Sequence, residues 1–166
     1  MEMTCTEEST IESDYENQQS YLKDSSKIIF IVVDLHGPKD IGKEEAYLKE
    51  WIPESEYSPK LAGDVNLFFG KEGELTEEYL KKGEVCAAEI SIMIAEKECQ
   101  RKGLGLEAVQ LMMKHGIEKY KVTHFIAKVS FKNEPSKRLF GEKLGYKMLR
   151  EIEAFEEIHY LFEVTL

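Results

Sequence analysis

Cysteine and histidine are scarce in this chain of 166 residues, and the shortage excludes two classes of protein. The three cysteines, Cys5, Cys86 and Cys99, are too few for a disulfide-rich secreted domain and lack the spacing of metal ligands. The four histidines show no metal-ligand spacing either. We therefore expect no metal cofactor, and we expect reduced thiols, which are typical of a cytoplasmic protein.

Long apolar runs are missing as well. The longest, IIFIVV at residues 28–33, is far too short to span a bilayer. The opening MEMTCTEEST is acidic and lacks the apolar core of a secretory signal. We therefore expect neither a membrane partner nor secretion.

A third shortage is positive charge, since the formal net charge is −10. This value argues against a nucleic-acid partner, which needs a broad basic face. The charge is uneven, because residues 97–150 hold thirteen Lys or Arg against five Glu. That segment suits an anionic ligand, and the acidic remainder suits a cationic partner. From charge alone, solvated surfaces whose signs cluster by chance are the favoured interpretation.

The hydrophobic pattern predicts one α/β domain. Ser9 and Glu12 form a capping-box pattern that opens a helix over residues 10–24. Residues 1–27 are then an acidic N-terminal segment with a helix, and residues 28–166 form a single domain. The further elements that we expect are strands over 27–34, 62–69, 85–95 and 123–131, a loop over 35–59, a helix over 133–144 and a terminal hairpin over 146–152 and 158–166.

A glycine-rich turn, QRKGLG at residues 100–105, leads from the strand over 85–95 into an amphipathic helix. Polar residues after Gly103 recur at spacings of three and four, which indicates one solvent stripe on that helix. The helix connects two strands by a crossover, so we expect those strands to be parallel. The turn leaves N–H groups free at the positive end of the helix dipole, where they form a phosphate cradle. Neither a P-loop nor a dinucleotide fingerprint fits, because GxxxxGK[ST] and the third glycine are absent.

QRKGLG resembles the Q/R-x-x-G-x-G/A turn of the acetyl-CoA-dependent N-acetyltransferases of the GNAT superfamily. NEPSKRLFGEKLGYKM, at residues 133–148, is similar to the second signature of that superfamily, an N-x-x-A/S helix that ends in K-L-G-F/Y. GDVNLFF, EISIMIAEKECQRKGLGLEAV and NEPSKRLF look especially like the N-acetyltransferase 9-like group. The resemblance covers roughly residues 28–166.

The resemblance implies an α/β fold of the GNAT type. Its mixed, twisted sheet is split between the strands over 85–95 and 123–131, and helices flank it. The family usually begins with a strand and a helix that build one wall of the acceptor groove. We expect this chain to begin after them, which leaves an unpaired edge on its first strand.

The resemblance also implies acetyl-CoA as co-substrate. In the family, the amides of the turn bind the pyrophosphate of coenzyme A, the end of the preceding strand pairs with the pantetheine arm, and an asparagine of the next helix contacts the cofactor. These roles carry over to Gln100, Arg101, Lys102, Gly103, Leu104 and Gly105 in the turn, to Ala95 at the strand end and to Asn133. Asn133 also has the position of an ordinary helix N-cap, and the two roles are compatible.

The reaction implied is acetyl transfer from the thioester to an amine of a peptide or protein. An amine must lose a proton before it attacks, and a positioned base contributes roughly 10² to 10⁴ in rate. Glu89 is the candidate base, because it lies eleven residues before Gln100, where histone-acetyltransferase-like members carry a catalytic glutamate. A glutamate that faces solvent, or pairs with a lysine on a neighbouring strand, is an equal alternative.

Two residues depart from the family pattern. Phe140 takes the position of a tyrosine general acid, for which Tyr146 is a weak substitute that we expect to pack at a strand start, and Gly141 adds one residue to the helix end. Phe140 and the missing N-terminal wall favour a second function, in which an inactive protein of this fold serves as a binding module or scaffold. The turn favours the enzyme, which we place first. The choice among an α-amine, a lysine and a small amine stays open.

Overall fold

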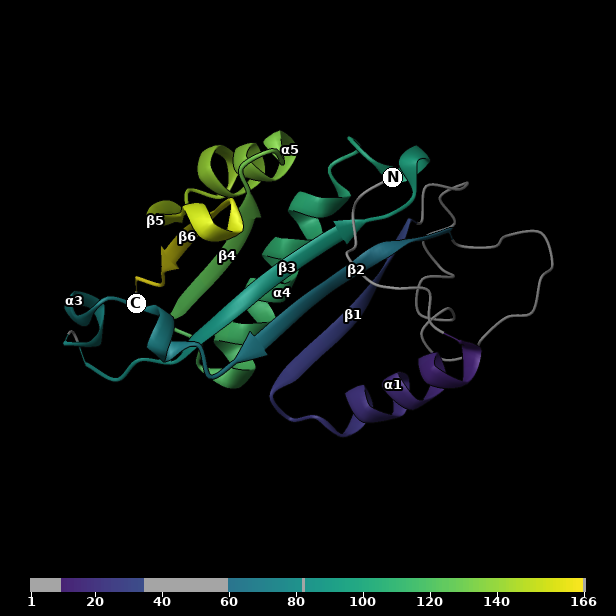
Figure 1. Ribbon diagram of the computed structural model, residues 1–166, viewed down its shortest axis with the longest axis horizontal. Helices are drawn as coiled ribbons and strands as arrows, with labels where there is room; N and C mark the ends of the chain where they lie inside the picture. Colours follow the sequence, from purple (N-terminus) through teal and green to yellow (C-terminus); the bar gives the residue numbers. More distant parts are fainter. Residues whose placement is uncertain (1–9, 35–59, 82, 166) are drawn as a thin grey trace.

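A computed structural model describes residues 10–34, 60–81 and 83–165 of the chain. The expected loop over 35–59 lies outside these residues. One mixed sheet contains all the described strands, in the order β1-β2-β3-β4-β6-β5 (Figure 1). The strands are β1 (Lys27–Asp34), β2 (Lys60–Phe69), β3 (Ala87–Ile94), β4 (His124–Ser130), β5 (Lys147–Ile152) and β6 (Glu157–Glu163).

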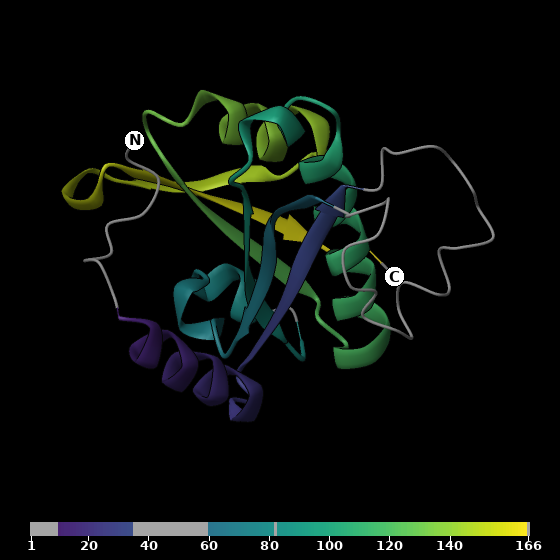
Figure 2. The same cartoon turned by 90° about the vertical axis from the view of Figure 1, so that its right-hand side faces the viewer.

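Helices lie on both faces of this sheet. They are α1 (Ile11–Lys23), α3 (Glu77–Leu80), α4 (Leu104–Tyr120) and α5 (Glu134–Lys137), with single turns η2 (Glu72–Glu74), η3 (Lys97–Cys99), η4 (Arg138–Lys143) and η5 (Glu153–Phe155). Figures 1 and 2 place α4 on one face, whereas α1 and α3 lie toward the other. None of these helices combines the length and the apolar character that crossing a membrane requires. The α/β architecture and the order of elements confirm the sequence-based expectation.

The strands β3 and β4 form the parallel pair, and they separate after a short contact. Their Cα register runs only from Ala87 opposite His124 to Glu89 opposite Ile126. Beyond Glu89, β3 continues to Ile94 and pairs with β2 on its other side. The split in the sheet therefore falls between the two strands that α4 connects, as predicted.

Apolar residues alternate with Glu89, Ser91 and Met93 along β3, so the two faces of the sheet differ in character. Ile90, Ile92 and Ile94 face α4 and pack with its buried residues Val109 and Met112. Burial of each such side chain contributes roughly 1.5–3 kcal/mol, so this layer fixes α4 firmly against the sheet. Because successive strand residues point to opposite faces, Glu89, Ser91 and Met93 lie on the face away from α4.

The N-terminal helix begins one residue later than the capping-box pattern predicted. Thr10 is its N-cap, and the hydroxyl oxygen of Thr10 accepts a hydrogen bond from the Ser13 backbone N–H at 3.2 Å. The expected cap at Ser9 was therefore wrong, since Thr10 offers the same acceptor one residue closer to the helix. Ser9 itself lies outside the described residues.

The helix expected over 133–144 consists of two short parts. After α5, the turn η4 is π-helical, and the N–H of Leu144 bonds back five residues to the carbonyl of Leu139 at 3.0 Å. An extra residue in a helix is accommodated by such a bulge. Gly141, the residue that exceeds the family pattern, lies inside this turn, where an added Cβ would be 3.4 Å from the Tyr160 ring.

Candidate functional site

The glycine-rich turn between β3 and α4 presents a row of unused backbone donors. From residue 101 to residue 106, no backbone N–H has an acceptor within the part of the chain that the structure describes. Two left-handed residues shape the row, Arg101 with φ 61° and Gly103 with φ 95°. These groups stand at the N-terminus of α4, where the helix dipole favours an anion. The backbone of the turn therefore has the unused donors that the predicted phosphate cradle requires, and the binding of a phosphate there stays a prediction.

Gly103 suits this cradle in two ways. Its φ is in the region that side chains rarely adopt, and a Cβ added there would meet no atom within 4 Å. The space above the turn is therefore open to a ligand. Gly105, one turn into α4, instead faces Ile92 and Ile94, whose side-chain atoms would lie 3.8 Å from an added Cβ. Gly105 brings the helix close to β3.

Two side chains tie the turn to the sheet. The Gln100 amide donates a 2.8 Å hydrogen bond to the carbonyl of Ile94, the last residue of β3. The Lys102 ammonium is 3.1 Å from the Asp34 carboxylate at the end of β1, and only 4% of the Asp34 side chain is exposed. The backbone N–H of Gln100 already donates to the Lys97 carbonyl at 3.2 Å, so Gln100 acts as a tether through its side chain.

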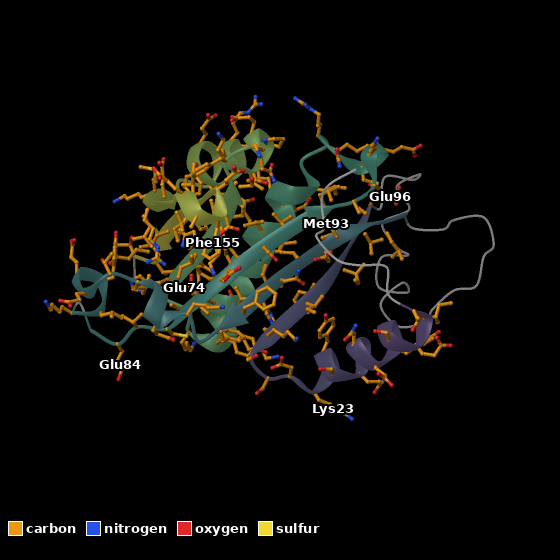
Figure 3. The ribbon with its side chains drawn as sticks, viewed as in Figure 1. Lys23, Glu74, Glu84, Met93, Glu96 and Phe155 are labelled. Carbon is orange, nitrogen blue, oxygen red and sulfur yellow. The ribbon has the colours of Figure 1, made fainter. Side chains whose placement is uncertain are left out.

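The strand end and the next helix supply the other expected residues. Ala95 is exposed directly after β3, between the last paired residue of that strand and η3. Asn133 caps α5, because its side-chain oxygen accepts the Ser136 N–H at 3.1 Å. The N-cap role of Asn133 is thus observed, and its contact with a cofactor stays a prediction. In Figure 3, Met93 lies toward the C-terminal end of β3, with Glu96 beyond it.

Glu89 lies at the point where β3 and β4 separate, and lysines surround it. Its Oε2 is 3.0 Å from the Lys128 ammonium on β4 and 3.6 Å from the Lys71 ammonium after β2. Lys128 also bonds Glu74, at 3.0 Å. Burial lowers the pKa of Lys128, but the hydrogen bonds that its ammonium donates to Glu89 and Glu74 outweigh burial and raise the pKa overall. The pairing with a neighbouring lysine, one of the two interpretations of Glu89, is observed.

Tyr146, the weak substitute for the family's general acid, lies in the core. Only 4% of Tyr146 is exposed, its hydroxyl donates to the Met113 sulfur at 3.3 Å, and its ring packs edge-on against Phe140. Burial raises the pKa of Tyr146 far above its usual range. Tyr146 therefore packs as expected, and Phe140 is equally buried.

A second polar group on the same sheet face was missed by sequence reasoning. Asp64 and Asn66 of β2 are the Cα partners of Met93 and Ser91. The Asn66 amide nitrogen is 2.5 Å from an Asp64 carboxylate oxygen and 3.2 Å from the Ser91 hydroxyl. The sequence signal for this group is the alternation of polar residues in GDVNLFF. That pattern places Asp64 and Asn66 on one face of a strand, but only the pairing of β2 with β3 brings them next to Ser91.

Other potential sites in the described residues are few. No three His, Cys, Asp or Glu side chains come together there in a way that suits a metal ion. A shallow cavity of about 380 Å³ is lined by residues of α1, among them Tyr15 and Lys23. None of the residues expected in the site lines it, so the turn and the split sheet remain the candidate site.

Comparisons with known proteins identify the family. Residues 38–147 match the acetyltransferase (GNAT) domain. An N-acetyltransferase 9-like protein of Nematostella vectensis is 38% identical, over 98% of this chain and 71% of its own length. The alpha/beta-tubulin-N-acetyltransferase 9 of Homo sapiens is 35% identical, over 94% of this chain and 65% of its own length.

A solved structure agrees in fold. Spermidine N-acetyltransferase from Vibrio cholerae, in complex with CoA and spermine, superposes with a TM-score of 0.62 at 16% identity, over 94% of this chain and 76% of that chain. The phosphate-cradle turn and the sheet split after Glu89 thus occur in a chain that matches acetyltransferases in both sequence and fold. This chain belongs to the GNAT family of acetyltransferases and is an N-acetyltransferase of the N-acetyltransferase 9-like group.

Proposed function

We propose that this enzyme transfers the acetyl group of acetyl-CoA to an amine of a peptide or protein by direct attack on the thioester. The row of unused N–H groups at residues 101–106 carries the proposal, because it offers an anion six donors at a helix N-terminus. The open space above Gly103 supports the same assignment. Acetyl-CoA fits these residues, and its thioester would supply the activated acetyl group.

The residues of the turn have distinct roles in this proposal. The N–H groups of Arg101, Lys102, Gly103, Leu104 and Gly105 bind the pyrophosphate, and the exposed Arg101 side chain adds positive charge. Gln100 fixes the distance from the cradle to the end of β3, near Ala95. Because no strand of the described residues pairs with the β4 side of β3 beyond Glu89, the backbone of β3 is available there to a pantetheine arm. Asn133 approaches from the start of α5.

Glu89 is our proposed base. Its carboxylate is about one-fifth exposed and lies where the two strands part. Lys71 and Lys128 hold the carboxylate in one place. The attacking amine, with an unperturbed pKa of about 8 for an α-amine or about 10.4 for a lysine, transfers a proton to it. Glu89 is thereby both a lysine partner and a proton acceptor.

The acceptor in this proposal is a protein amine in the cytoplasm. The acidic surface outside residues 97–150 favours a cationic acceptor. A human relative is named an alpha/beta-tubulin-N-acetyltransferase, which supports a protein acceptor. The three cysteines of the sequence are too few for a disulfide-rich secreted domain, which supports a reducing compartment.

Release of free CoA with defined peptides tests this function. The purified chain is incubated with acetyl-CoA and a peptide that has either a free N-terminus without lysine or a blocked N-terminus with one lysine. CoA release that needs one of these amines, with an added acetyl group in the peptide mass, is the expected result. The fully blocked, lysine-free peptide is the control. If no peptide supports release while acetyl-CoA still binds, the chain acts as a binding module and the transferase proposal is wrong.

A further inference from the structure

The face of the sheet away from α4 carries a carboxylate that no cation neutralises. Asp64 of β2 is partly buried, and within the described residues no lysine, arginine or histidine forms an ion pair with it. The other two carboxylates that flank the site differ, because Glu89 pairs with Lys71 and Lys128, and Asp34 pairs with Lys102. Among the carboxylates named here, Asp64 is the one that a cationic ligand can reach without displacing a lysine of the described residues.

Asn66 and Ser91 hold this carboxylate in position. The amide nitrogen of Asn66 donates to Asp64 Oδ2 and to the Ser91 hydroxyl, so both of its hydrogens are used. The amide oxygen of Asn66 is buried and accepts no hydrogen bond in the described structure. The amide nitrogen of Asn66 therefore fixes the orientation of the Asp64 carboxylate.

The strand register places this group beside the split in the sheet. Asp64 is the Cα partner of Met93, which lies on β3 beyond the last residue that pairs with β4. Residues directly opposite in an antiparallel pair share a face, so Asp64, Met93 and Glu89 all lie on the face away from α4. Met93 is four residues from Glu89, or about 13 Å along the strand.

Aliphatic surface adjoins the carboxylate on its other side. Ile31 and Ile29 of β1 are the Cα partners of Asp64 and Asn66, and they remain 60% and 36% exposed. An anionic oxygen beside exposed methyl groups is complementary to an ammonium group on a hydrocarbon stem. Lysine side chains, peptide N-termini and aliphatic polyamines share this chemistry.

We propose that Asp64, positioned by Asn66 and Ser91, binds a primary ammonium group of the acceptor other than the amine that is acetylated. This inference rests on the proposed acetyl transfer, and it assigns the acceptor side of the same site. The ammonium pairs with the Asp64 carboxylate, and its aliphatic stem lies against Ile29 and Ile31, about 13 Å along the sheet from the proposed base Glu89.

Binding of a simple amine tests this proposal without turnover. The probe is n-butylammonium chloride, added to the ¹⁵N-labelled chain while the side-chain amide signals of Asn66 are followed. The same titration with n-butanol supplies the hydrocarbon without the charge. We expect a saturable shift of the Asn66 signals with butylammonium, no shift with butanol, and loss of the shift in Asp64→Asn. Asp64→Ser is the second variant if Asp64→Asn does not fold.

A kinetic measurement separates this inference from the proposed function. In Asp64→Asn, we expect the KM for an acceptor peptide that has a second ammonium group to rise at least tenfold, with the affinity for acetyl-CoA unchanged within twofold. Glu84→Gln, an exposed carboxylate elsewhere, is the matched control (Figure 3). An unchanged acceptor KM, or an equal butylammonium shift in Asp64→Asn, would overturn the role of Asp64 even if acetyl transfer occurs. If the wild-type chain releases no CoA, the proposed function fails and the butylammonium titration alone decides.

Discussion

The Lys128 ammonium lies 3.0 Å from Glu89 Oε2, across the last paired residues of β3 and β4. The same nitrogen is 3.0 Å from Glu74 Oε1, so Lys128 joins two carboxylates from different parts of the chain. This contact fixes Glu89 at the point where the sheet opens. Substitution of Glu89 tests whether its carboxylate also accepts a proton during the reaction.

Glu89→Gln keeps the size of the side chain and removes its basicity. We expect kcat to fall by roughly 10² to 10⁴ at neutral pH, because a positioned base contributes a factor of that order. The affinity for acetyl-CoA should stay unchanged, since Glu89 lies away from the turn. Steady-state kinetics with a saturating peptide measure the effect, with Glu84→Gln as control. A kcat within threefold of wild type would exclude Glu89 as the base.

The pairing of Lys128 makes stability depend on alkaline pH. The pKa of Lys128 is raised above its ordinary 10.5, so its ion pairs stabilise the fold fully below that pH and lose their effect as the pH rises past it. Thermal unfolding of wild type and Lys128→Met between pH 8 and pH 11.5 tests this. We expect the two Tm values to converge at high pH. A constant difference would mean that the charge of Lys128 contributes nothing.

Gly63 allows β2 to approach the end of β3. A Cβ at this position would lie 1.8 Å from the Met93 carbonyl oxygen, so Gly63→Ala must push the strands apart. We expect a loss of roughly 1–3 kcal/mol, as for other overpacked positions, and a Tm lower by about 2–4 °C per kcal/mol. Gly73→Ala is the control, since its added Cβ meets open space. Equal Tm values for the two variants would contradict this close packing.

Tyr146→Phe removes a hydroxyl that, in this structure, serves packing alone. The hydroxyl bonds the Met113 sulfur in the core, so its loss should cost about 0.5–1.5 kcal/mol of unfolding free energy. We expect kcat within twofold of wild type. A tenfold lower kcat, with acetyl-CoA affinity intact, would instead make Tyr146 the general acid.

The sequence was sufficient to predict the helices and strands of the described residues and the place of the glycine-rich turn. Local sequence signals predict the elements and the turn. These signals are the apolar run KIIFIVVD, the helical spacing after Gly103 and the glycines of QRKGLG. The unused donors at residues 101–106 follow directly from that turn geometry. The start of α1 was one residue off, because Ser9 and Thr10 are both good caps and the pattern does not choose between them.

The surroundings of Glu89 and the Asp64 group could not be predicted in the same way. Lys128 is 39 residues from Glu89 in the chain, and only the parallel register of β3 and β4 brings them together. Asp64 and Asn66 meet Ser91 through the antiparallel register of β2 and β3. Strand pairing depends on the tertiary structure. The sequence patterns therefore identified these polar residues as strand residues but could not predict which residues they contact on the neighbouring strands.

Binding of acetyl-CoA, measured by calorimetry on this chain, tests the central claim most directly. The variant is Gly103→Glu, which places a side chain at φ 95° and a carboxylate above the donor row. Gly73→Glu adds the same charge at an open position away from the turn. We predict that wild type and Gly73→Glu bind acetyl-CoA and that Gly103→Glu loses at least 100-fold in affinity. No binding by wild type at millimolar acetyl-CoA, or equal binding by Gly103→Glu, would contradict the assignment of the turn.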